Sequence, residues 1–355
     1  MNLEDMRRKI DETDASIVRL IAERIRNAEK IGREKRKQGK QIEDVEREQR
    51  VLENVRRVAR EENINPEGIE SIYQQIVNVS KSAEGMLVAF QGEIGAYSEE
   101  AAFHFFGPAI QVRPCESLDD VFKVVEQGEA QFGIVPIENS LEGSISRVYD
   151  LLFDSALKVW GETELRVIHC LIASPASRLD LIKRVYSHPQ ALGQCRAFLK
   201  HLDCELISTY DTAGSVKMIK EQGITDGAAI AGIRAAEIYG MKILAREIED
   251  NPNNFTRFFI LAKQDSPPTG NDKTSIVFSV KDRPGALYEF LKELSDRNIN
   301  LTKIESRPTK QRPWEYNFYL DFEGHYQDKT SLEALASLEK ITLFLKVIGS
   351  YPKAA

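Results

Sequence analysis

Residues 86–102 read Met-Leu-Val-Ala-Phe-Gln-Gly-Glu-Ile-Gly-Ala-Tyr-Ser-Glu-Glu-Ala-Ala. A short apolar run is followed by two glycines and then by Ser98, which can cap a helix, so the stretch predicts a strand, a turn and a helix. The same alternation recurs near residues 133, 167, 184 and 228. Strands that alternate with helices predict an α/β domain with a largely parallel sheet, and we assign residues 86–264 to it.

Residues 1–85, before this domain, predict only helices. Apolar side chains recur at three- and four-residue steps from about Leu3 to Lys37, which is the periodicity of a helix. At 1.5 Å per residue this helix would be roughly 50 Å long, too long to bury its apolar stripe inside one small domain. We therefore expect it to pair with a helix from a second copy of the chain. Two more helices are expected, at about residues 42–62 and 66–83.

The sequence after the α/β domain predicts a third domain. Residues 265–273 form a turn-rich linker that contains two prolines. Residues 274–355 then predict a strand, a helix, two strands, a helix and a strand, the order of a ferredoxin-like α+β domain.

Composition narrows the class of protein. A length of 355 residues favours two or three domains, and a net charge of −7 argues against a general nucleic-acid binder. No apolar run approaches the roughly 20 residues of a membrane helix, and the first residues are acidic, unlike a signal peptide. The four cysteines are far apart, form no CxxC pair and predict reduced thiols in the cytoplasm, with no metal site.

Two cations interrupt the apolar stripe of the first helix. Arg24 lies between Ile21 and Ile25, and Lys35 lies about three turns further on, on nearly the same face. Most charges in this segment would lie on solvated faces, but a guanidinium within an apolar stripe needs a partner. Two long side chains on one face could converge on a small anion.

These residues, together with Asp44-Val-Glu-Arg-Glu48 and Ser80, resemble the all-helical chorismate mutases over nearly the whole first segment. The resemblance implies an intertwined dimer in which Arg24, and Arg7 from the other chain, hold the two carboxylates of chorismate. It also implies that Lys35 donates to the ether oxygen. The implied chorismate-binding residues are Arg7, Arg24, Lys35, Asp44, Arg47, Glu48, Ser80 and Glu84.

Glu84 departs from the glutamine that many of these mutases have. A carboxylate facing the ether oxygen would repel it, so we expect Glu84 to act as a protonated acid and mutase activity to rise toward acidic pH. The rearrangement requires only a compact conformer and stabilisation of charge that develops on oxygen, so no cofactor is expected.

Polar motifs follow several strands of the central domain, where α/β sites gather. Taken singly, each is consistent with a turn or a helix cap, and His188 with a satisfied loop histidine. Together and in this order they resemble prephenate dehydratase, most distinctively in Asn-Phe-Thr-Arg-Phe at residues 254–258. The motif residues singled out as candidates for prephenate binding are Glu138, Asn139, Ser140, Ser187, Gln190, Thr212, Ser215 and Arg257.

The dehydratase resemblance implies two α/β lobes, similar to type II periplasmic binding proteins, with the site in the cleft between them. It makes Thr256 the expected proton donor to the departing ring hydroxyl and Arg257 a carboxylate partner. A free hydroxyl is a poor acid, so neighbouring groups must assist Thr256.

The third domain carries Pro-Gly-Ala-Leu at residues 284–287 and Glu-Ser-Arg-Pro at residues 305–308. This pair of motifs resembles the phenylalanine-binding ACT domain, whose pocket lies at the interface of two such domains. The residues expected there are Gly285, Ala286, Leu287, Asn300, Leu301, Glu305, Ser306, Arg307 and Pro308. Inhibition by phenylalanine further requires that it bind two states of the enzyme with different affinity.

The favoured interpretation is a bifunctional enzyme of phenylalanine biosynthesis. It would convert chorismate to prephenate and then to phenylpyruvate, as at least a dimer, without nucleic-acid or membrane partners. Three alternatives remain open: a dehydratase with a degraded mutase domain, a ligand-sensing regulatory protein whose basic run at residues 33–40 dimerises or touches nucleic acid, and a solute-binding transport protein.

Overall fold

The computed structural model describes residues 3–37, 45–84, 86–108, 110–309 and 315–354. The chain divides into two compact units. The first comprises Met1–Val88 with Phe103–Val112, and the second comprises Ala89–Ala102 with Arg113–Ala355.

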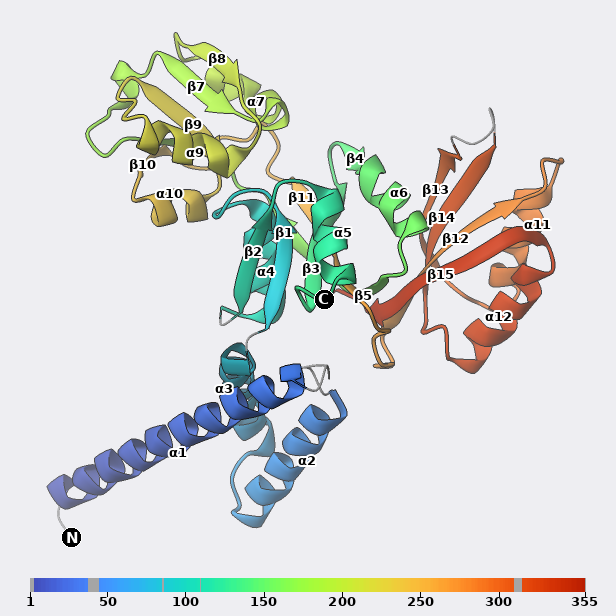
Figure 1. Ribbon diagram of the computed structural model, residues 1–355, viewed down its shortest axis with the longest axis horizontal. Helices are drawn as coiled ribbons and strands as arrows, with labels where there is room; N and C mark the ends of the chain where they lie inside the picture. Colours follow the sequence, from blue (N-terminus) through green and yellow to red (C-terminus); the bar gives the residue numbers. More distant parts are fainter. Residues whose placement is uncertain (1–2, 38–44, 85, 109, 310–314, 355) are drawn as a thin grey trace. The chain divides into compact units, whose positions relative to one another are not determined.

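The first unit is built on three helices, as the apolar periodicity predicts (Figure 1). They are α1 (Leu3–Lys37), α2 (Val45–Glu61) and α3 (Pro66–Glu84). The Asn65 carboxamide accepts from the amides of Glu67 and Gly68, and this cap explains why α3 begins where it does. Much of the apolar stripe of α1 lies open in the single chain: Met6, Ile10, Ile17 and Leu20 are 45% to 65% exposed.

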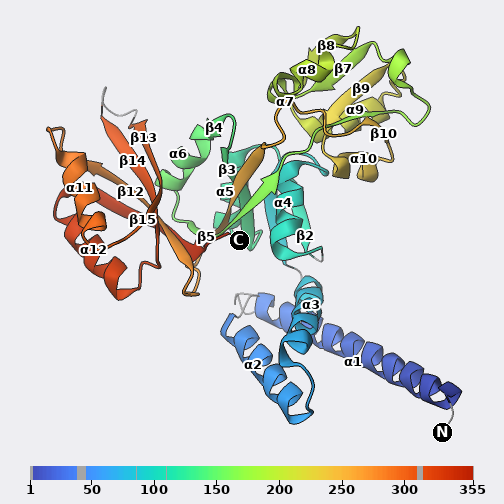
Figure 2. The same ribbon diagram turned by 180° about the vertical axis from the view of Figure 1, so that it is seen from behind.

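The central α/β region has two lobes, each around its own sheet (Figures 1 and 2). The first sheet has the order β2-β1-β3-β11-β5, with β4 paired to β3. Its strands are β1 (Leu87–Gln91), β2 (Gln111–Cys115), β3 (Phe132–Asn139), β4 (Gly143–Ser144), β5 (Lys158–Arg166) and β11 (Phe255–Ala262). The helices of this lobe are α4 (Tyr97–Phe106), α5 (Leu118–Glu126) and α6 (Ser146–Asp154).

The second lobe has a five-stranded sheet of order β10-β6-β9-β7-β8. Its strands are β6 (Cys170–Ala173), β7 (Arg184–Ser187), β8 (Glu205–Ser208), β9 (Gly227–Ala231) and β10 (Lys242–Ala245). Its helices are the 3-10 turn η1 (Leu179–Leu181), α7 (Pro189–Gln194), α8 (Arg196–Leu199), α9 (Thr212–Glu221) and α10 (Ile233–Tyr239). The chain crosses between the lobes at residues 167–169 and again at residues 246–254.

The expectation of a largely parallel sheet was wrong. Strand β11 runs antiparallel to both β3 and β5, and β6 runs antiparallel to β9 and β10, whereas β7 pairs in parallel with β8 and β9. The reason is the second crossover: β11 returns from the second lobe and enters the first sheet between two strands that already run the other way. Residues 167–169, expected as part of a strand, belong to the first crossover.

The C-terminal region has the predicted ferredoxin-like order and a four-stranded antiparallel sheet, β13-β14-β12-β15. Its elements are β12 (Asp272–Val280), α11 (Ala286–Ser295), β13 (Leu301–Pro308), β14 (Tyr316–Glu323), α12 (Lys329–Glu339) and β15 (Thr342–Pro352). Both helices pack on one apolar cluster, in which the rings of Phe278 and Phe290 stack with centroids 3.6 Å apart. Strand β12 takes in the last two residues of the expected linker.

The C-terminal domain packs tightly against the first lobe. A Cβ added to Gly349 would lie 2.3 Å from the carbonyl oxygen of Val159, so the backbones of β15 and β5 meet where only glycine fits. The Lys346 ammonium donates to the carbonyls of Leu152, Phe153 and Ser155 at 3.1, 2.7 and 2.7 Å, which satisfies the C-terminus of α6.

Candidate active site

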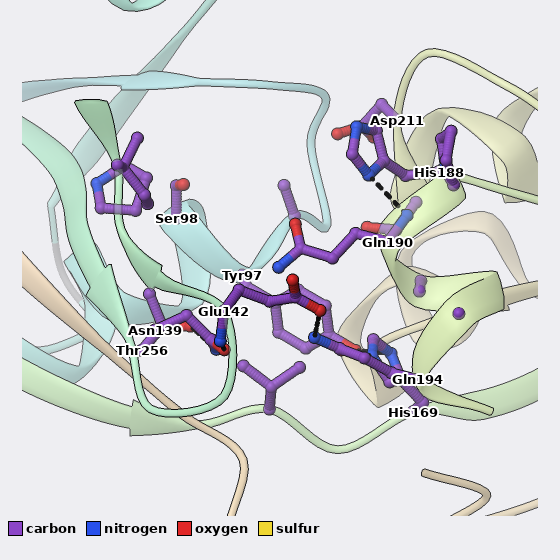
Figure 3. A pocket seen from close by; sticks show the side chains of 18 of the residues that line it. Tyr97, Ser98, Asn139, Glu142, His169, His188, Gln190, Gln194, Asp211 and Thr256 are labelled. Carbon is purple, nitrogen blue, oxygen red and sulfur yellow. Dashed lines mark hydrogen bonds between the residues drawn. The ribbon is translucent and has the colours of Figure 1, made fainter. Parts of the chain in front are cut away.

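A cavity of about 760 Å³ is lined by residues of both lobes (Figure 3). The first lobe contributes the start of α4, the hairpin of β3 and β4, and β11, while the second contributes α7 and the loop before α9. Its polar lining includes Tyr97, Ser98, Asn139, Glu142, Ser144, His169, His188, Gln190, Gln194, Arg196, Tyr210, Asp211, Thr212 and Thr256.

Thr256 and Asn139 meet in this cavity because their strands are neighbours. Thr256 of β11 lies opposite Asn139 at the end of β3, and side chains that face each other across an antiparallel pair share one face of the sheet. The Asn139 Nδ2 donates to Thr256 Oγ1 at 3.0 Å, and both residues are buried. The structure thus brings together two residues that are far apart in the sequence.

Arg257 lies elsewhere. Successive side chains of a strand point to opposite faces, so the neighbour of Thr256 points away from the cavity. Its guanidinium is 11% exposed and pairs with Glu162 at 2.6 Å and Asp321 at 2.7 Å, between the first lobe and the C-terminal domain. Burial opposes its charge, but Tyr351 and these two carboxylates still raise the pKa of Arg257. In this structure the residue therefore joins two domains instead of facing a substrate.

The remaining candidates for prephenate binding divide into two groups. Gln190 and Thr212 line the cavity. The other four are not among the lining residues, and their side chains engage protein groups. The hydroxyl of Ser187 donates to Ile230 O, that of Ser215 to Asp211 O and that of Ser140 to Asn253 O, and Glu138 pairs with Lys303 at 2.7 Å.

Several cavity residues were absent from the sequence-based candidates. Tyr97 and Ser98 begin a helix after a glycine turn, and Asp211 caps α9 by accepting from Gly214 N at 2.6 Å, so position after a strand could have indicated all three. Burial, with Glu93 adding to it, raises the pKa of Asp211. His169 and Gln194 carry no such signal, since one lies in a crossover and the other at the last turn of a short helix.

In the first unit, the structure brings Arg24 and Ser80 together. The Arg24 guanidinium is half-buried, donates to the Ser80 hydroxyl and lies 3.4 Å from the carbonyl oxygen of Ile76. Arg7 is exposed, and seventeen residues of helix place it roughly 25 Å from Arg24. Arg47 is exposed near the start of α2. Asp44 lies outside the described residues, as do the side chains of Lys35, Glu48 and Glu84.

In the C-terminal domain, Gly285 adopts a positive φ of 82° at the N-cap of α11, with Ala286 and Leu287 packed at or beside the core. Asn300 accepts from Glu323 N, and Leu301 opens β13. Along β13, Glu305 bonds the Ser144 hydroxyl, and Arg307 pairs with Asp150 at 3.2 Å. Ser306 lies between them, and Arg307 and Pro308 line a second cavity of about 440 Å³ beside α6.

Two negative findings apply to the described part of the chain. It contains no group of three or more His, Cys, Asp or Glu side chains arranged to hold a metal ion. None of its helices combines the length and apolarity needed to cross a membrane.

Comparison with known proteins matches the three regions in order. Residues 6–85 match type II chorismate mutases, residues 88–266 match prephenate dehydratases and residues 274–340 match the ACT domain. A bifunctional chorismate mutase/prephenate dehydratase of Aquifex aeolicus is 41% identical over 359 residues, which cover 99% of this chain and 98% of the relative.

Solved structures resemble the second and third regions. The prephenate dehydratase of Arthrobacter aurescens in complex with L-Phe aligns with a TM-score of 0.70 and 33% identity, covering 76% of this chain and 90% of its own. A protein described as GqqA, a novel type of quorum quenching acylase, aligns with the same TM-score at 34% identity, covering 76% of this chain and 98% of its own.

Proposed function

The chain belongs to the bifunctional chorismate mutase/prephenate dehydratases, and from this premise we propose which of its residues carry out and regulate the two reactions. The chain is an enzyme with both activities, and its C-terminal domain is an ACT domain. Chorismate is rearranged to prephenate, which loses water and carbon dioxide to give phenylpyruvate. We assign these roles to residues 1–85, 86–264 and 274–355.

For the mutase, Arg24 and Ser80 form one end of the chorismate site. The contact between α1 and α3 supports this role: the Arg24 guanidinium is half-buried, and both its bonds, to the Ser80 hydroxyl and the Ile76 carbonyl, come from Nη1, so its other nitrogens retain donors for a carboxylate. Lys35 would donate to the ether oxygen, with Asp44, Arg47, Glu48 and Glu84 completing the site.

Arg7 cannot serve the same site as Arg24 within one subunit, since the two lie on one continuous helix roughly 25 Å apart. We propose that α1 of a second subunit supplies Arg7, in a dimer that also covers the open apolar stripe of α1. Co-expressing Arg7→Ala and Arg24→Ala subunits tests this arrangement. Mixed dimers should regain mutase activity that neither variant has alone, and no recovery in isolated mixed dimers would contradict the shared site.

For the dehydratase, the site is the cavity between the lobes, and the observation that carries this assignment is the buried contact between Asn139 and Thr256. Thr256 donates its proton to the ring hydroxyl as the C–O bond breaks and water leaves, and it then regains a proton from solvent. The ring carboxylate leaves as carbon dioxide, and its bonding electrons complete the aromatic ring. Gln190 and Thr212 bind the substrate from the opposite lobe. The geometry favours a structural role for Arg257.

For regulation, we propose that phenylalanine binds the ACT domain and inhibits the dehydratase through strand β13. This strand contacts the hairpin that lines the cavity: Lys303 donates to Ser144 Oγ at 3.0 Å and pairs with Glu138, and Glu305 also bonds Ser144. Ser144 itself lines the cavity, so a shift of β13 would reach the site through one side chain.

A cytoplasmic location is proposed from the four free cysteines.

One assay tests the whole assignment. Purified protein is incubated with chorismate while phenylpyruvate is measured, with and without phenylalanine. We expect phenylpyruvate to form and phenylalanine to slow its formation. Prephenate that accumulates without phenylpyruvate would contradict the dehydratase assignment, and unchanged chorismate with turnover of added prephenate would indicate a degraded mutase.

A further inference from the structure

A continuous chain of hydrogen bonds runs from the Asn139 side chain to Tyr97 through three intervening side chains (Figure 3 labels most of its members). In order, Asn139 Nδ2 lies 2.8 Å from Asn254 Oδ1, Asn254 Nδ2 lies 2.9 Å from Gln194 Oε1, Gln194 Oε1 lies 2.9 Å from His169 Nε2, and His169 Nδ1 lies 2.8 Å from the Tyr97 hydroxyl. Asn254 is fully buried and His169 is nearly so. Thr256 joins this chain at Asn139.

Two backbone amides decide the direction of the bonds that run from Asn139 to His169. The amides of Leu141 and Glu142 donate to Asn139 Oδ1 at 3.0 and 3.1 Å. A backbone N–H can only donate, so the oxygen of the Asn139 carboxamide must face the hairpin and its NH₂ group must face Thr256. Because that NH₂ group only donates, Thr256 Oγ1 accepts from it and keeps its own proton free for another acceptor.

The same logic continues into the second lobe. Asn254 accepts from Asn139 and must therefore donate to Gln194, whose Oε1 is then an acceptor for His169 as well. His169 must therefore carry a proton on Nε2, because Gln194 Oε1 can only accept. The Tyr97 hydroxyl lies 2.8 Å from His169 Nδ1 and also donates to the carbonyl oxygen of Ile168 at 2.8 Å, so two acceptors share its one proton. Burial lowers the pKa of His169, so a neutral ring is also what its surroundings favour.

Gln194 holds the central position in this chain. It belongs to α7 of the second lobe, whereas its partners His169 and Asn254 belong to the two segments where the chain crosses between lobes. The side-chain nitrogen of Gln194 lies 3.5 Å from Glu142 Oε1. Both polar atoms of the side chain therefore contact protein groups, although the residue lines the cavity.

We propose that Gln194 is a positioning residue of the dehydratase: it holds Asn254 in place. Asn254 Oδ1 then keeps the NH₂ group of Asn139, already turned by the hairpin amides, beside Thr256, so that Thr256 presents its proton to the substrate. The proposal rests on the assignment of Thr256 as proton donor. The proposal also gives the second lobe a part in positioning Thr256 on the first lobe, because Gln194 of α7 bonds a residue of each crossover segment.

The kinetic test uses Gln194→Met, which keeps the length of the side chain and removes its acceptor. Asn254 and His169 then each lose their partner, and we expect kcat for prephenate to fall roughly 10- to 100-fold. The KM should stay within about twofold of wild type, because Gln194 spends its polar atoms on protein groups. Mutase activity of the same preparation should be unchanged, and Gln222→Met on the exposed end of α9 serves as the matched control.

Two kinetic outcomes would overturn the proposal: a kcat within twofold of wild type, or a raised KM at unchanged kcat, which would mean that Gln194 binds substrate directly. An equal loss of both enzyme activities would also count against it, since the effect would then not be specific to Thr256.

A second measurement does not depend on activity. In protein labelled with ¹⁵N-histidine, the resonances of His169, assigned by comparison with a His169→Gln variant, report which ring nitrogen carries the proton. We expect the neutral Nε2–H tautomer in the wild-type protein. The Nδ1–H tautomer would reverse the direction of the chain and overturn the proposal, whereas a wild-type enzyme that lacks dehydratase activity but has the Nε2–H tautomer would contradict only the assigned reaction.

Discussion

Replacing Thr256 with valine tests the central catalytic assignment with little change of shape. Valine has nearly the volume of threonine and the same preference for a strand, so only the hydroxyl is removed. If Thr256 protonates the leaving hydroxyl, prephenate turnover should fall by about 10²- to 10⁴-fold, the range that a positioned general acid contributes.

The stability of the variant should change much less. The Asn139 NH₂ group that donates to Thr256 also lies 2.8 Å from Asn254 Oδ1 and 3.1 Å from the carbonyl oxygen of Phe255. Thr256→Val therefore leaves no buried donor without an acceptor, and we expect a loss of only about 1 kcal/mol in the free energy of unfolding. A large loss of activity would then not be a consequence of unfolding.

The assay compares phenylpyruvate formation from prephenate with chorismate rearrangement in the same preparation. The mutase rate should be unchanged, and Thr302→Val, on the exposed side of β13, provides a matched control. Dehydratase activity within tenfold of wild type would refute the role of Thr256. A parallel loss of mutase activity would refute the independence of the two sites.

Three further outcomes are expected. Arg24→Ala should abolish mutase activity and spare turnover of added prephenate, and loss of both rates would contradict separate sites. Arg257→Met should cost about 3–5 kcal/mol in the urea-induced unfolding of the second unit, because it leaves the buried Asp321 carboxylate without a cation and Glu162 with Lys273 alone. Arg178→Met, at an exposed ion pair, should cost no more than about 1 kcal/mol, and equal effects would contradict this account. Burial lowers the pKa of His169 from 6.5, so the unfolded chain takes up a proton first as pH falls, and the contribution of His169 to stability should be lost below about pH 6.5. Dehydratase kcat should decline only at a lower pH, at which the folded enzyme protonates His169; a His169→Gln variant that keeps the same acid limb would assign it to another group.

Much of the fold is local and could be predicted from the sequence. The first helix ends where its apolar periodicity ends, at Lys37, and the third begins at Pro66 as proline at a first helical position predicts. The C-terminal domain follows its alternating strands and periodic helices in the expected order. What could not be predicted was the direction of β11, because strand direction depends on the lobe from which the chain returns and not on the composition of the strand.

The candidate site divides in the same way. Asn139 stands in a motif at the end of a strand and Thr256 in a distinctive motif at the start of another, so residue type and position alone mark them as candidates for chemistry. Gln194 and His169 lie in segments without such a pattern, and their place in the cavity depends on two crossovers that the sequence does not reveal.

The sequence by itself determined three domains, their secondary structure and a threonine in a distinctive motif, because periodicity, turn residues and motif spacing act over a few residues. Tertiary structure alone decided which way each side chain faces. Strand alternation turned Arg257 toward a buried ion pair and Thr256 toward the cavity. Two backbone amides of the hairpin then set the direction of a hydrogen-bond chain across both lobes, and so decided that Thr256 can donate its proton.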